Sequence, residues 1–385
     1  MPVIVQKYGG TSVGTHDRLL RVARRVAALR GAGNDVVVVV SARGGTTDSL
    51  VEQARAFTRK PAQRELDMLM TAGERISMSL LAIALNSLDC PAVSFTGSQV
   101  GIITDTRHTE ARILEVRPHR VRLELERGNV VVVGGFQGVS TAKDVTTLGR
   151  GGSDTTAVAL AAALGAERCE ILTDVDAVHT ADPREVPEAR RIDELSYEDM
   201  AELARFGATV LKESAVAFAE RSGIEIHVGS SDSDTPGTIV LSTPSDGDPP
   251  ITGISLLRGA VFLTGDSSEV HRSLRGLEAD GWTVRMTVST ESGAAAAAEE
   301  PTAAGPASVA DGVEARPAHI VAVVGREAVT AETAARCRSA LLDTGTRLLA
   351  ATASGRTALH VVPPEDSGDL VRRFHRELFE TRGLD

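Results

Sequence analysis

The chain has 385 residues, of which 42% are hydrophobic and 3% aromatic, and its 41 basic and 52 acidic residues give a net charge of −11 at pH 7 with neutral histidine. This length suffices for two or three ordinary domains. An acidic chain with few aromatic rings lacks the cationic surface that binds nucleic acid or an anionic bilayer, so neither is an expected partner.

Three further features point to a soluble, cytoplasmic protein. The longest strongly apolar runs, residues 36–40 and 157–164, are far shorter than the roughly 20 residues that cross a bilayer. The first ten residues do not show the cationic segment and apolar core of an export signal. Cys90, Cys169 and Cys337 are odd in number and widely separated, which is typical of reduced thiols and not of a disulfide scaffold or a clustered metal site.

From residue 3 to about residue 241, short Val/Ile runs alternate with longer amphipathic segments, a pattern typical of an α/β domain with a mostly parallel sheet. The clearest helix is predicted at residues 17–29, where an apolar stripe lies opposite three arginines. Another helix is predicted at residues 155–164. Strands are predicted at residues 3–6, 35–40, 92–95, 130–133, 169–172, 225–228 and 238–241.

After a boundary loop, the remainder of the sequence has the pattern of two smaller α+β units. Residues 242–250, rich in Ser, Asp, Gly and Pro, form the predicted boundary loop. The two units are residues 251–290 and 319–385, with helices expected at 268–281 and 331–345. Residues 291–318, dominated by Ala, Glu, Gly and Pro, are predicted to be a flexible linker whose alanine run is at most transiently helical.

The first chemical motif, KYGGTSVG at residues 7–14, follows a predicted strand and precedes a predicted helix. Its glycine pair lets the backbone approach a ligand, its hydroxyl groups donate to oxyanions, and Lys7 supplies positive charge. An ordinary strand-to-helix turn is the commoner explanation of an isolated Gly-Gly pair. The motif matches neither the dinucleotide fingerprint nor the G-x-x-x-x-G-K-[ST] phosphate loop.

The second motif is a glycine-rich loop, TTLGRGGSD at residues 146–154, that leads into an Ala-rich helix. Ser153 or Asp154 is predicted to be the helix N-cap, and the free amides of the first turn favour an anion. Alone, Asp154 is most simply a cap. Arg150 is harder to explain structurally, because a guanidinium beside three glycines suits two-point binding of a carboxylate or phosphate.

The third motif, LTDVDAVHTADPR at residues 172–184, runs from a strand end into an acidic turn. Carboxylates here either order the turn or shape a metal–nucleotide site, and the turn is the simpler explanation. The lone His179 is likewise more often a surface or packing residue than a catalyst.

Together the motifs resemble an aspartate kinase of the amino-acid kinase superfamily. The matching segments follow the family's order over residues 1–241 and lie at residues 7–13, 41–48, 72–77, 94–101, 134–138, 147–157 and 173–184. The resemblance implies a three-layer α/β/α sandwich that transfers the γ-phosphoryl group of ATP, with Mg²⁺ arriving on ATP, to the side-chain carboxylate of L-aspartate. This chemistry needs alignment and charge stabilisation, not a covalent nucleophile.

The resemblance also implies roles for individual residues. Lys7 would neutralise charge on the transferred group, Glu74 would hold the substrate ammonium with Asp154 assisting, and Arg150 would clamp the α-carboxylate. Ser41, Thr47 and Ser153 complete the expected aspartate site. Nucleotide contacts are expected from Lys7, Gly9, Gly10, Thr11, Thr173, Asp174, His179, Arg184, Thr209 and Val210.

Two departures from the family pattern fall in the nucleotide half of the site. The family normally has Tyr in the place of His179, and it reads Gly-Ala-Lys-Val-Leu-His-Pro where this chain reads GATVLKE at residues 207–213. A lysine expected near the phosphates is thus Thr209, a loss worth several kcal/mol in a dry site. Lys212 would replace that cation if one helical turn separates the two positions, and is otherwise a solvated surface charge.

The C-terminal part is similar to the paired ACT modules that bind feedback amino acids and join subunits in this family. The second copy is recognisable at residues 320–325 and 359–362. In the first, a strand that usually ends in Gln-Asn reads VRMTVST at residues 284–290. Exposed strand edges of such modules usually pair, so a homodimer is expected.

Three functions remain open at this stage. The first is an aspartate kinase, including a specialised-pathway paralogue with reduced feedback control. The second is a kinase of another small carboxylate or phosphonate, and the third is a catalytically silent subunit that binds amino acids. Glu74, Arg150 and Asp154 favour aspartate, whereas Thr209 favours the silent subunit.

We predict weak or absent inhibition by lysine and threonine, because the degenerate strand at residues 284–290 lacks the amide side chains that meet an effector. Steady-state kinase assays over a concentration series of each amino acid measure this. A steep inhibition curve at sub-millimolar concentration would contradict the prediction.

Overall fold

A computed structural model describes residues 1–149, 151–233, 235, 237–290, 293–299 and 309–380. The chain forms two compact units that alternate along the sequence. The first comprises Met1–Val178, Ile192–Tyr197 and Val210–Pro244. The second comprises His179–Arg191, Glu198–Thr209 and Ser245–Asp385.

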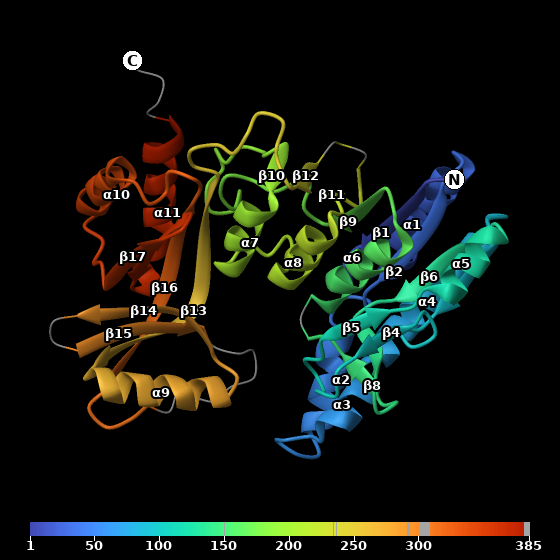
Figure 1. Cartoon of the computed structure of the whole chain (residues 1–385), viewed down its shortest axis with the longest axis horizontal. Coiled ribbons are helices and arrows are strands. Elements are labelled where there is room, and N and C mark those ends of the chain that lie inside the picture. Colours follow the sequence, from blue (N-terminus) through green and yellow to red (C-terminus); the bar gives the residue numbers. More distant parts are fainter. Residues whose placement is uncertain (150, 234, 236, 291–292, 300–308, 381–385) are drawn as a thin grey trace. The chain divides into compact units, whose positions relative to one another are not determined.

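An eight-stranded sheet forms the centre of the first unit, in the order β10-β12-β11-β9-β1-β2-β6-β3 (Figure 1). All neighbouring strands pair in parallel except β11 and β12. The strands are β1 (Val3–Tyr8), β2 (Asp35–Val40), β3 (Ala92–Phe95), β6 (Val130–Gly134), β9 (Arg168–Thr173), β10 (Glu194–Ser196), β11 (Ile226–Ser230) and β12 (Thr238–Leu241). The predicted α/β region is confirmed, and its predicted strands are present with ends shifted by at most two residues.

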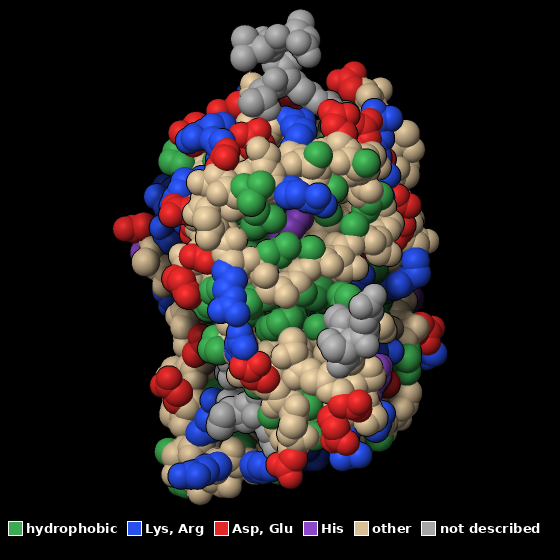
Figure 2. All heavy atoms as spheres, turned by 90° about the vertical axis from the view of Figure 1, so that its left-hand side faces the viewer, with side chains coloured by type: hydrophobic (Ala, Val, Ile, Leu, Met, Phe, Trp, Pro, Cys, Tyr) green, Lys and Arg blue, Asp and Glu red, His purple; other side chains and the backbone are tan. Residues whose placement is uncertain are grey.

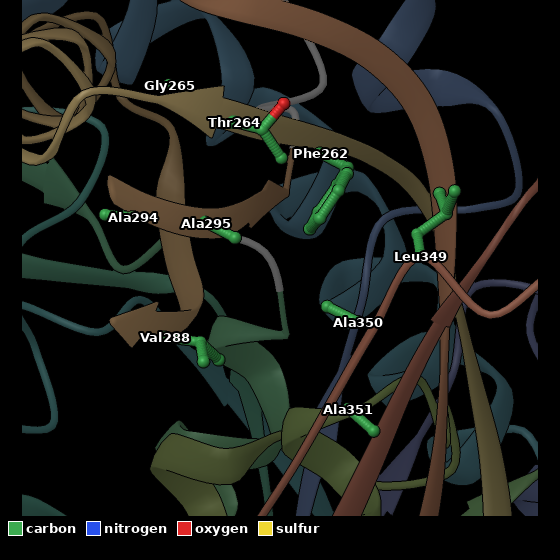
Figure 3. A pocket seen from close by; sticks show the side chains of 9 residues that line it. All are labelled: Phe262, Thr264, Gly265, Val288, Ala294, Ala295, Leu349, Ala350 and Ala351. Atoms are coloured by element: carbon green, nitrogen blue, oxygen red, sulfur yellow. The ribbon is translucent and has the colours of Figure 1, made fainter. Parts of the chain in front are cut away.

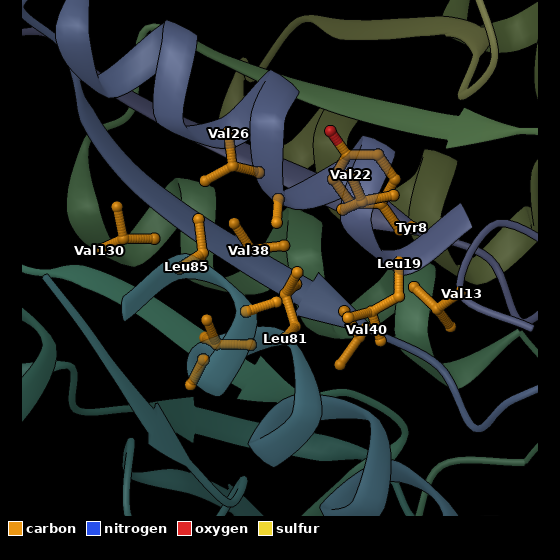
Figure 4. Close-up of a cluster of buried hydrophobic side chains, with 14 of the residues drawn as sticks. Tyr8, Val13, Leu19, Val22, Val26, Val38, Val40, Leu81, Leu85 and Val130 are labelled. Carbon is orange, nitrogen blue, oxygen red and sulfur yellow. The ribbon is translucent and has the colours of Figure 1, made fainter. Parts of the chain in front are cut away.

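Helices pack on both faces of this sheet. On one face, α1 (His16–Gly31) and α4 (Ala72–Asn86) bury aliphatic side chains against β1, β2 and β6 (Figure 4). On the other face, α6 (Gly152–Leu164) contacts β1, β2 and β9 and packs against α8 (Glu213–Ser222). Residues 36–40 of β2 are all fully buried valines, as expected for a strand covered on both sides.

A second, smaller sheet and three short helices complete the first unit. A small sheet has the order β5-β4-β7-β8, with β4 (Ile102–Thr104), β5 (Ile113–Val116), β7 (Gln137–Ser140) and β8 (Val145–Thr147). Three shorter helices accompany it, namely α2 (Thr46–Arg55), α3 (Gln63–Met70) and α5 (His119–Glu126). None of these small strands was predicted from the sequence.

One helical stretch, Gln63–Asn86, has the length and composition of a membrane span, with a mean hydropathy of 1.4 over its most apolar window. The apolar runs of the sequence had not indicated such a stretch. However, 56% of that window is buried inside the protein, and the core helix of a soluble protein passes the same test.

The second unit is built on an antiparallel sheet in the order β14-β15-β13-β16-β18-β17. Its strands are β13 (Gly253–Gly265), β14 (Thr283–Thr290), β15 (Gly293–Glu299), β16 (Glu314–Val324), β17 (Ala350–Ser354) and β18 (Thr357–Val362). The helices are α7 (Tyr197–Arg205, whose first residue lies in the first unit), α9 (Ser267–Ala279), α10 (Ala331–Thr344) and α11 (Ser367–His375), with single turns at Pro364–Asp366 and Arg376–Glu380. On the face of this unit seen in Figure 2, hydrophobic side chains gather centrally and charged ones lie mostly toward the margins.

The predicted linker at residues 291–318 is wrong in two places, because β15 occupies Gly293–Glu299 and β16 begins at Glu314. The alanine run is therefore a strand and not a transient helix. It lies between β13 and β14, where Ala294, Ala296 and Ala298 pack in the cluster beside α9. Pairing on both sides outweighs the helical preference of alanine. Residues 291–292 and 300–308 of the predicted linker lie outside the described part of the chain.

We predict that Ala296→Glu destabilises the second unit by about 3 kcal/mol or more, because it buries a charge without a partner. Ala296 is 0% exposed. Ala353→Glu on the edge strand β17 serves as the matched control, because Ala353 is exposed. Urea unfolding measures both variants. Equal stability of the two would mean that residues 293–299 behave as a linker.

Candidate active site

The carboxyl ends of β1, β2, β6 and β9 meet at one edge of the large sheet. Hydrogen bonds carry the parallel pairing one residue further: Gly9 N–H donates to Leu172 O at 3.2 Å, and Ser41 N–H donates to Tyr8 O at 3.2 Å. The structure therefore brings together Lys7, Gly9, Ser41 and Thr173, which the sequence analysis had assigned to one site.

A buried ion pair lies at this edge. Lys7 Nζ is 2.6 Å from Asp154 Oδ1, and the two residues are only 9% and 6% exposed. The predicted cap role of Ser153 or Asp154 is wrong, because α6 begins at Gly152 and its N-cap is Gly151 in the left-handed conformation (φ 71°). This earlier start places Asp154 inside the first turn, and its carboxylate reaches Lys7 instead of capping the helix.

The turn after β1 forms an open cradle beside the ion pair. A Cβ atom added at Gly9 would meet only Thr173 Oγ1, Lys7 Nζ and Thr11 Oγ1, all at 3.8–3.9 Å. At Gly10, by contrast, a Cβ atom would lie 2.5 Å from Ala42 O. In this turn the N–H groups of Gly9, Ser12 and Gly14 donate to backbone carbonyls, whereas those of Gly10 and Thr11 have no backbone partner among the described residues. An ammonium, two hydroxyls and spare amides fit a phosphate group.

Glu74, in the first turn of α4, is a buried carboxyl group at the end of β2. It is 3% exposed, and its Oε1 accepts a hydrogen bond from Ala42 N–H at 3.0 Å. Oε2 has no hydrogen-bond partner among the described residues. Burial raises the pKa of Glu74 to about 7, although backbone hydrogen bonds oppose the shift. Glycine at position 73 permits this approach, since a Cβ there would lie 2.7 Å from Ala42 Cβ.

Phe136 belongs to the site and was not singled out from the sequence, although the matched segment 134–138 contained it. Its φ of 68° is strained for an aromatic residue. Its N–H donates to Thr156 Oγ1 of α6 at 3.1 Å. Ser153 lies close by, because a Cβ added at Gly135 would be 2.7 Å from Ser153 Oγ. The turn after β6 thus lies directly against the first turn of α6.

The expected nucleotide contacts divide between the two units. Thr173, Asp174 and Val210 lie in the first unit, and Thr173 Oγ1 donates to Asp174 Oδ1 at 2.9 Å. His179, Arg184 and Thr209 lie in the second unit.

The other residues assigned to the site from the sequence have the following surroundings. Arg184 pairs with Asp182 at 2.7 Å and holds the pKa of that carboxyl below its usual range. The backbone of His179 pairs with that of Arg191 in an isolated antiparallel β-bridge. Thr47 is half-buried in the first turn of α2. Arg150 lies outside the described residues.

The described residues contain no cluster of three or more His, Cys, Asp or Glu side chains suited to a metal ion. What the edge of the sheet offers is a buried ammonium beside an open glycine turn, and a buried carboxylate with a free oxygen. This arrangement can bind an anion and an ammonium group next to one another.

Comparisons with known proteins agree on one family. The chain matches the amino acid kinase family over residues 2–230. The aspartokinase of Mycobacterium tuberculosis is 55% identical over 268 residues, which are 69% of this chain and 64% of that protein. The aspartokinase of Corynebacterium glutamicum is 48% identical over 290 residues, 72% of this chain and 69% of that protein. This chain thus matches somewhat less than two thirds of the length of the mycobacterial relative.

A solved structure extends the likeness to nearly the whole chain. E. coli aspartokinase III in complex with aspartate and ADP (R-state) is similar with a TM-score of 0.83 at 27% identity, covering 98% of this chain and 100% of that one.

We predict a pH-dependent loss of substrate binding that depends on Glu74. Below pH about 7 its carboxyl takes up a proton and cannot pair with an ammonium, so kcat/KM for an amino-acid substrate should fall as the pH drops through that value. Glu74→Gln should remove this step, whereas Glu52→Gln on the exposed surface should retain it. Identical profiles for the wild type and Glu74→Gln would contradict the prediction.

The raised pKa of Glu74 also makes the free energy of unfolding depend on pH. The pKa of Glu74 is higher in the folded protein, about 7, than its ordinary value of 4.5, so the folded state binds the proton more tightly. The contribution of Glu74 to the free energy of unfolding therefore declines as the pH rises between those two values. Chemical unfolding of the wild type and Glu74→Gln across this range measures the difference.

Proposed function

This chain belongs to the amino acid kinase family and, within it, to the aspartokinases, and from that membership we propose that it phosphorylates L-aspartate. In the proposed reaction a side-chain carboxylate oxygen of aspartate attacks the γ-phosphorus of ATP. The bond from that phosphorus to ADP breaks, and 4-phospho-L-aspartate forms. The observation that carries the proposal is the buried Lys7–Asp154 pair beside the open turn at Gly9.

The phosphoryl half of the site rests on β1 and the turn after it. Lys7 would neutralise the charge that develops on the transferred group, Gly9 would leave room for it, and the amides of Gly10 and Thr11 would hold its oxygens. Because Lys7 is already fixed by an ion pair at 2.6 Å, little reorganisation is needed when phosphate enters. The ADP in E. coli aspartokinase III supports ATP as the donor. Mg²⁺ carried by ATP would neutralise part of the triphosphate charge.

The aspartate half rests on α4, α2 and the start of α6. The free Oε2 of Glu74 would accept a hydrogen bond from the substrate ammonium, with Asp154 nearby. Ser41, Thr47 and Ser153 would line the acceptor carboxylate, and Arg150 would bind the α-carboxylate. The aspartate in the E. coli relative supports this acceptor.

The remaining nucleotide contacts are assigned to Thr173, Asp174, His179, Arg184, Thr209 and Val210. In the acidic turn at residues 182–184, Arg184 pairs with Asp182 at 2.7 Å, and the Arg184 N–H donates to Asp182 Oδ1 at 2.9 Å. Three of the six, His179, Arg184 and Thr209, belong to the second unit.

The second unit would serve as two ACT-like modules that join subunits into a homodimer through the edge strands of the six-stranded sheet, β14 and β17. A pocket of about 440 Å³ lies beside β13–β15 and β17 (Figure 3). Only Thr264 among its lining residues carries a polar side chain. The three cysteines, all buried and free, support a cytoplasmic location.

One assay tests the proposed reaction and its alternatives. The purified chain is incubated with ATP, Mg²⁺, hydroxylamine and a panel of small acids, and any hydroxamate is identified by mass. We expect aspartyl hydroxamate, which the wild type should form and Lys7→Met should not. Another hydroxamate would indicate a different acceptor, and none with any acid would indicate a silent subunit.

Lys212 is proposed to replace the lysine missing at position 209. The helical reach predicted from the sequence is wrong, because Lys212 is the N-cap of α8 in an extended conformation and Thr209 lies in the other unit. Lys212 instead contacts the glycine-rich loop at residues 146–154. Its side chain lies over Gly151, where an added Cβ would be 1.9 Å from Lys212 Cγ. Thr155 and Ser214, joined by a 2.9 Å hydrogen bond, tie α6 to α8 at the same place.

We expect Lys212→Met to raise KM for ATP and lower kcat, together by about tenfold, because the variant keeps the aliphatic packing over Gly151 and removes only the charge. Lys60→Met, which removes an exposed charge, is the control. Steady-state kinetics and thermal unfolding measure both. Unchanged kinetics for Lys212→Met would mean that the charge has no part in the reaction.

A further inference from the structure

Asp67 on α3 is a fully buried carboxylate that the proposed reaction does not use. It is 0% exposed. Its Oδ1 accepts hydrogen bonds from Thr147 Oγ1 at 2.6 Å and from Thr109 N–H at 3.0 Å. Its Oδ2 lies 2.6 Å from His108 Nδ1. Both oxygens are therefore satisfied, and the partners come from two other segments of the chain.

The two segments that Asp67 joins both border the substrate site. Thr147 is the last residue of β8, directly before the glycine-rich loop that contains Arg150 and leads to Ser153 and Asp154. His108 and Thr109 belong to the connection between β4 and β5. Thr109 O also lies beside the loop, 3.4 Å from where a Cβ of Gly149 would be.

The backbone at Thr109 and the carboxylate of Asp67 are both held in conformations that their neighbours impose. Thr109 has a φ of 66°, which a β-branched residue adopts only when its surroundings impose it. Three hydrogen-bond donors satisfy this buried carboxylate. Loss of one donor would leave a carboxylate oxygen buried with one hydrogen bond fewer. Asp67 therefore fixes the direction in which the chain leaves β8.

We propose that Asp67, through Thr147, is a positioning residue for the substrate loop, holding its described residues 148–149 and 151–154 in the arrangement that binds the amino-acid substrate. This inference rests on the proposed function, since it assigns Asp67 to the same site. It predicts that weakening the Asp67–Thr147 hydrogen bond impairs aspartate binding more than it impairs folding.

The neighbouring residue provides a matched control. Thr146 is also 0% exposed, and its Oγ1 is 2.7 Å from Thr104 Oγ1. Because side chains alternate along a strand, Thr146 and Thr147 lie on opposite faces of β8. Each loses one buried hydroxyl hydrogen bond on change to valine, yet only Thr147 is tied to Asp67.

The experiment compares full-length wild type, Thr147→Val, Thr147→Ser and Thr146→Val. We expect Thr147→Val to raise KM for aspartate by roughly tenfold or more, with KM for ATP unchanged and thermal stability close to that of Thr146→Val. Thr147→Ser, which retains the hydroxyl, should restore KM. Equal KM values for the two valine variants, or failure of serine to restore binding, would overturn the inference.

Hydrogen exchange supplies a readout that needs no activity. We expect faster amide exchange at residues 148–154 in Thr147→Val than in Thr146→Val, with equal exchange in α8. Absence of that difference would overturn the positioning role even if the wild type forms aspartyl hydroxamate. A wild type that forms none would overturn the proposed function, while the exchange data would still decide the role of Asp67.

Discussion

The structure of the site depends on one buried ion pair, Lys7 with Asp154, at the carboxyl edge of a parallel sheet. Removing two charges from water is costly, and only close, well-aligned pairing compensates for the cost. Here the distance from Lys7 Nζ to Asp154 Oδ1 is 2.6 Å, but Asp154 Oδ1 has no hydrogen-bond partner among the described residues, so the pair is close without the alignment that would fully offset this cost. The pair keeps an ammonium in a water-poor place beside the open turn at Gly9, where an entering phosphate would meet it.

The neighbouring strands, helices and glycines set the positions of Lys7, Asp154 and the residues around them. Parallel pairing of β1 with β2 and β9 sets the position of Lys7. The left-handed Gly151 starts α6 early enough for Asp154 to face Lys7. Glycines at positions 10, 73 and 135 allow the strand ends, α4 and α6 to approach one another. The role proposed for Asp67 would place a similar constraint on the loop that precedes α6, through the hydrogen bond with Thr147.

Much of this could be predicted from the sequence, and the exceptions have physical causes. Hydrophobic runs located the strands of the large sheet except β10, and glycine-rich motifs pointed to Lys7 and Asp154, whereas Glu74 was assigned only through the family resemblance. The alanine strand at residues 293–299 was mistaken for a linker, because composition does not reveal that two neighbouring strands will pair with it. The cap of α6 was misplaced, because glycine in a left-handed conformation competes with serine and aspartate for that position. The contact of Lys212 with Gly151 and the partners of Asp67 join residues far apart in the chain, which local patterns do not report.

The most direct test of the account is a double-mutant cycle on the rate of phosphoryl transfer in a single turnover, using Lys7→Met, Asp154→Asn and the double variant. If the pair acts as one unit, each single change should slow transfer by about a hundredfold or more, and the double variant should be no slower than the slower single one. Losses that simply multiply, or a Lys7→Met rate close to that of the wild type, would contradict it.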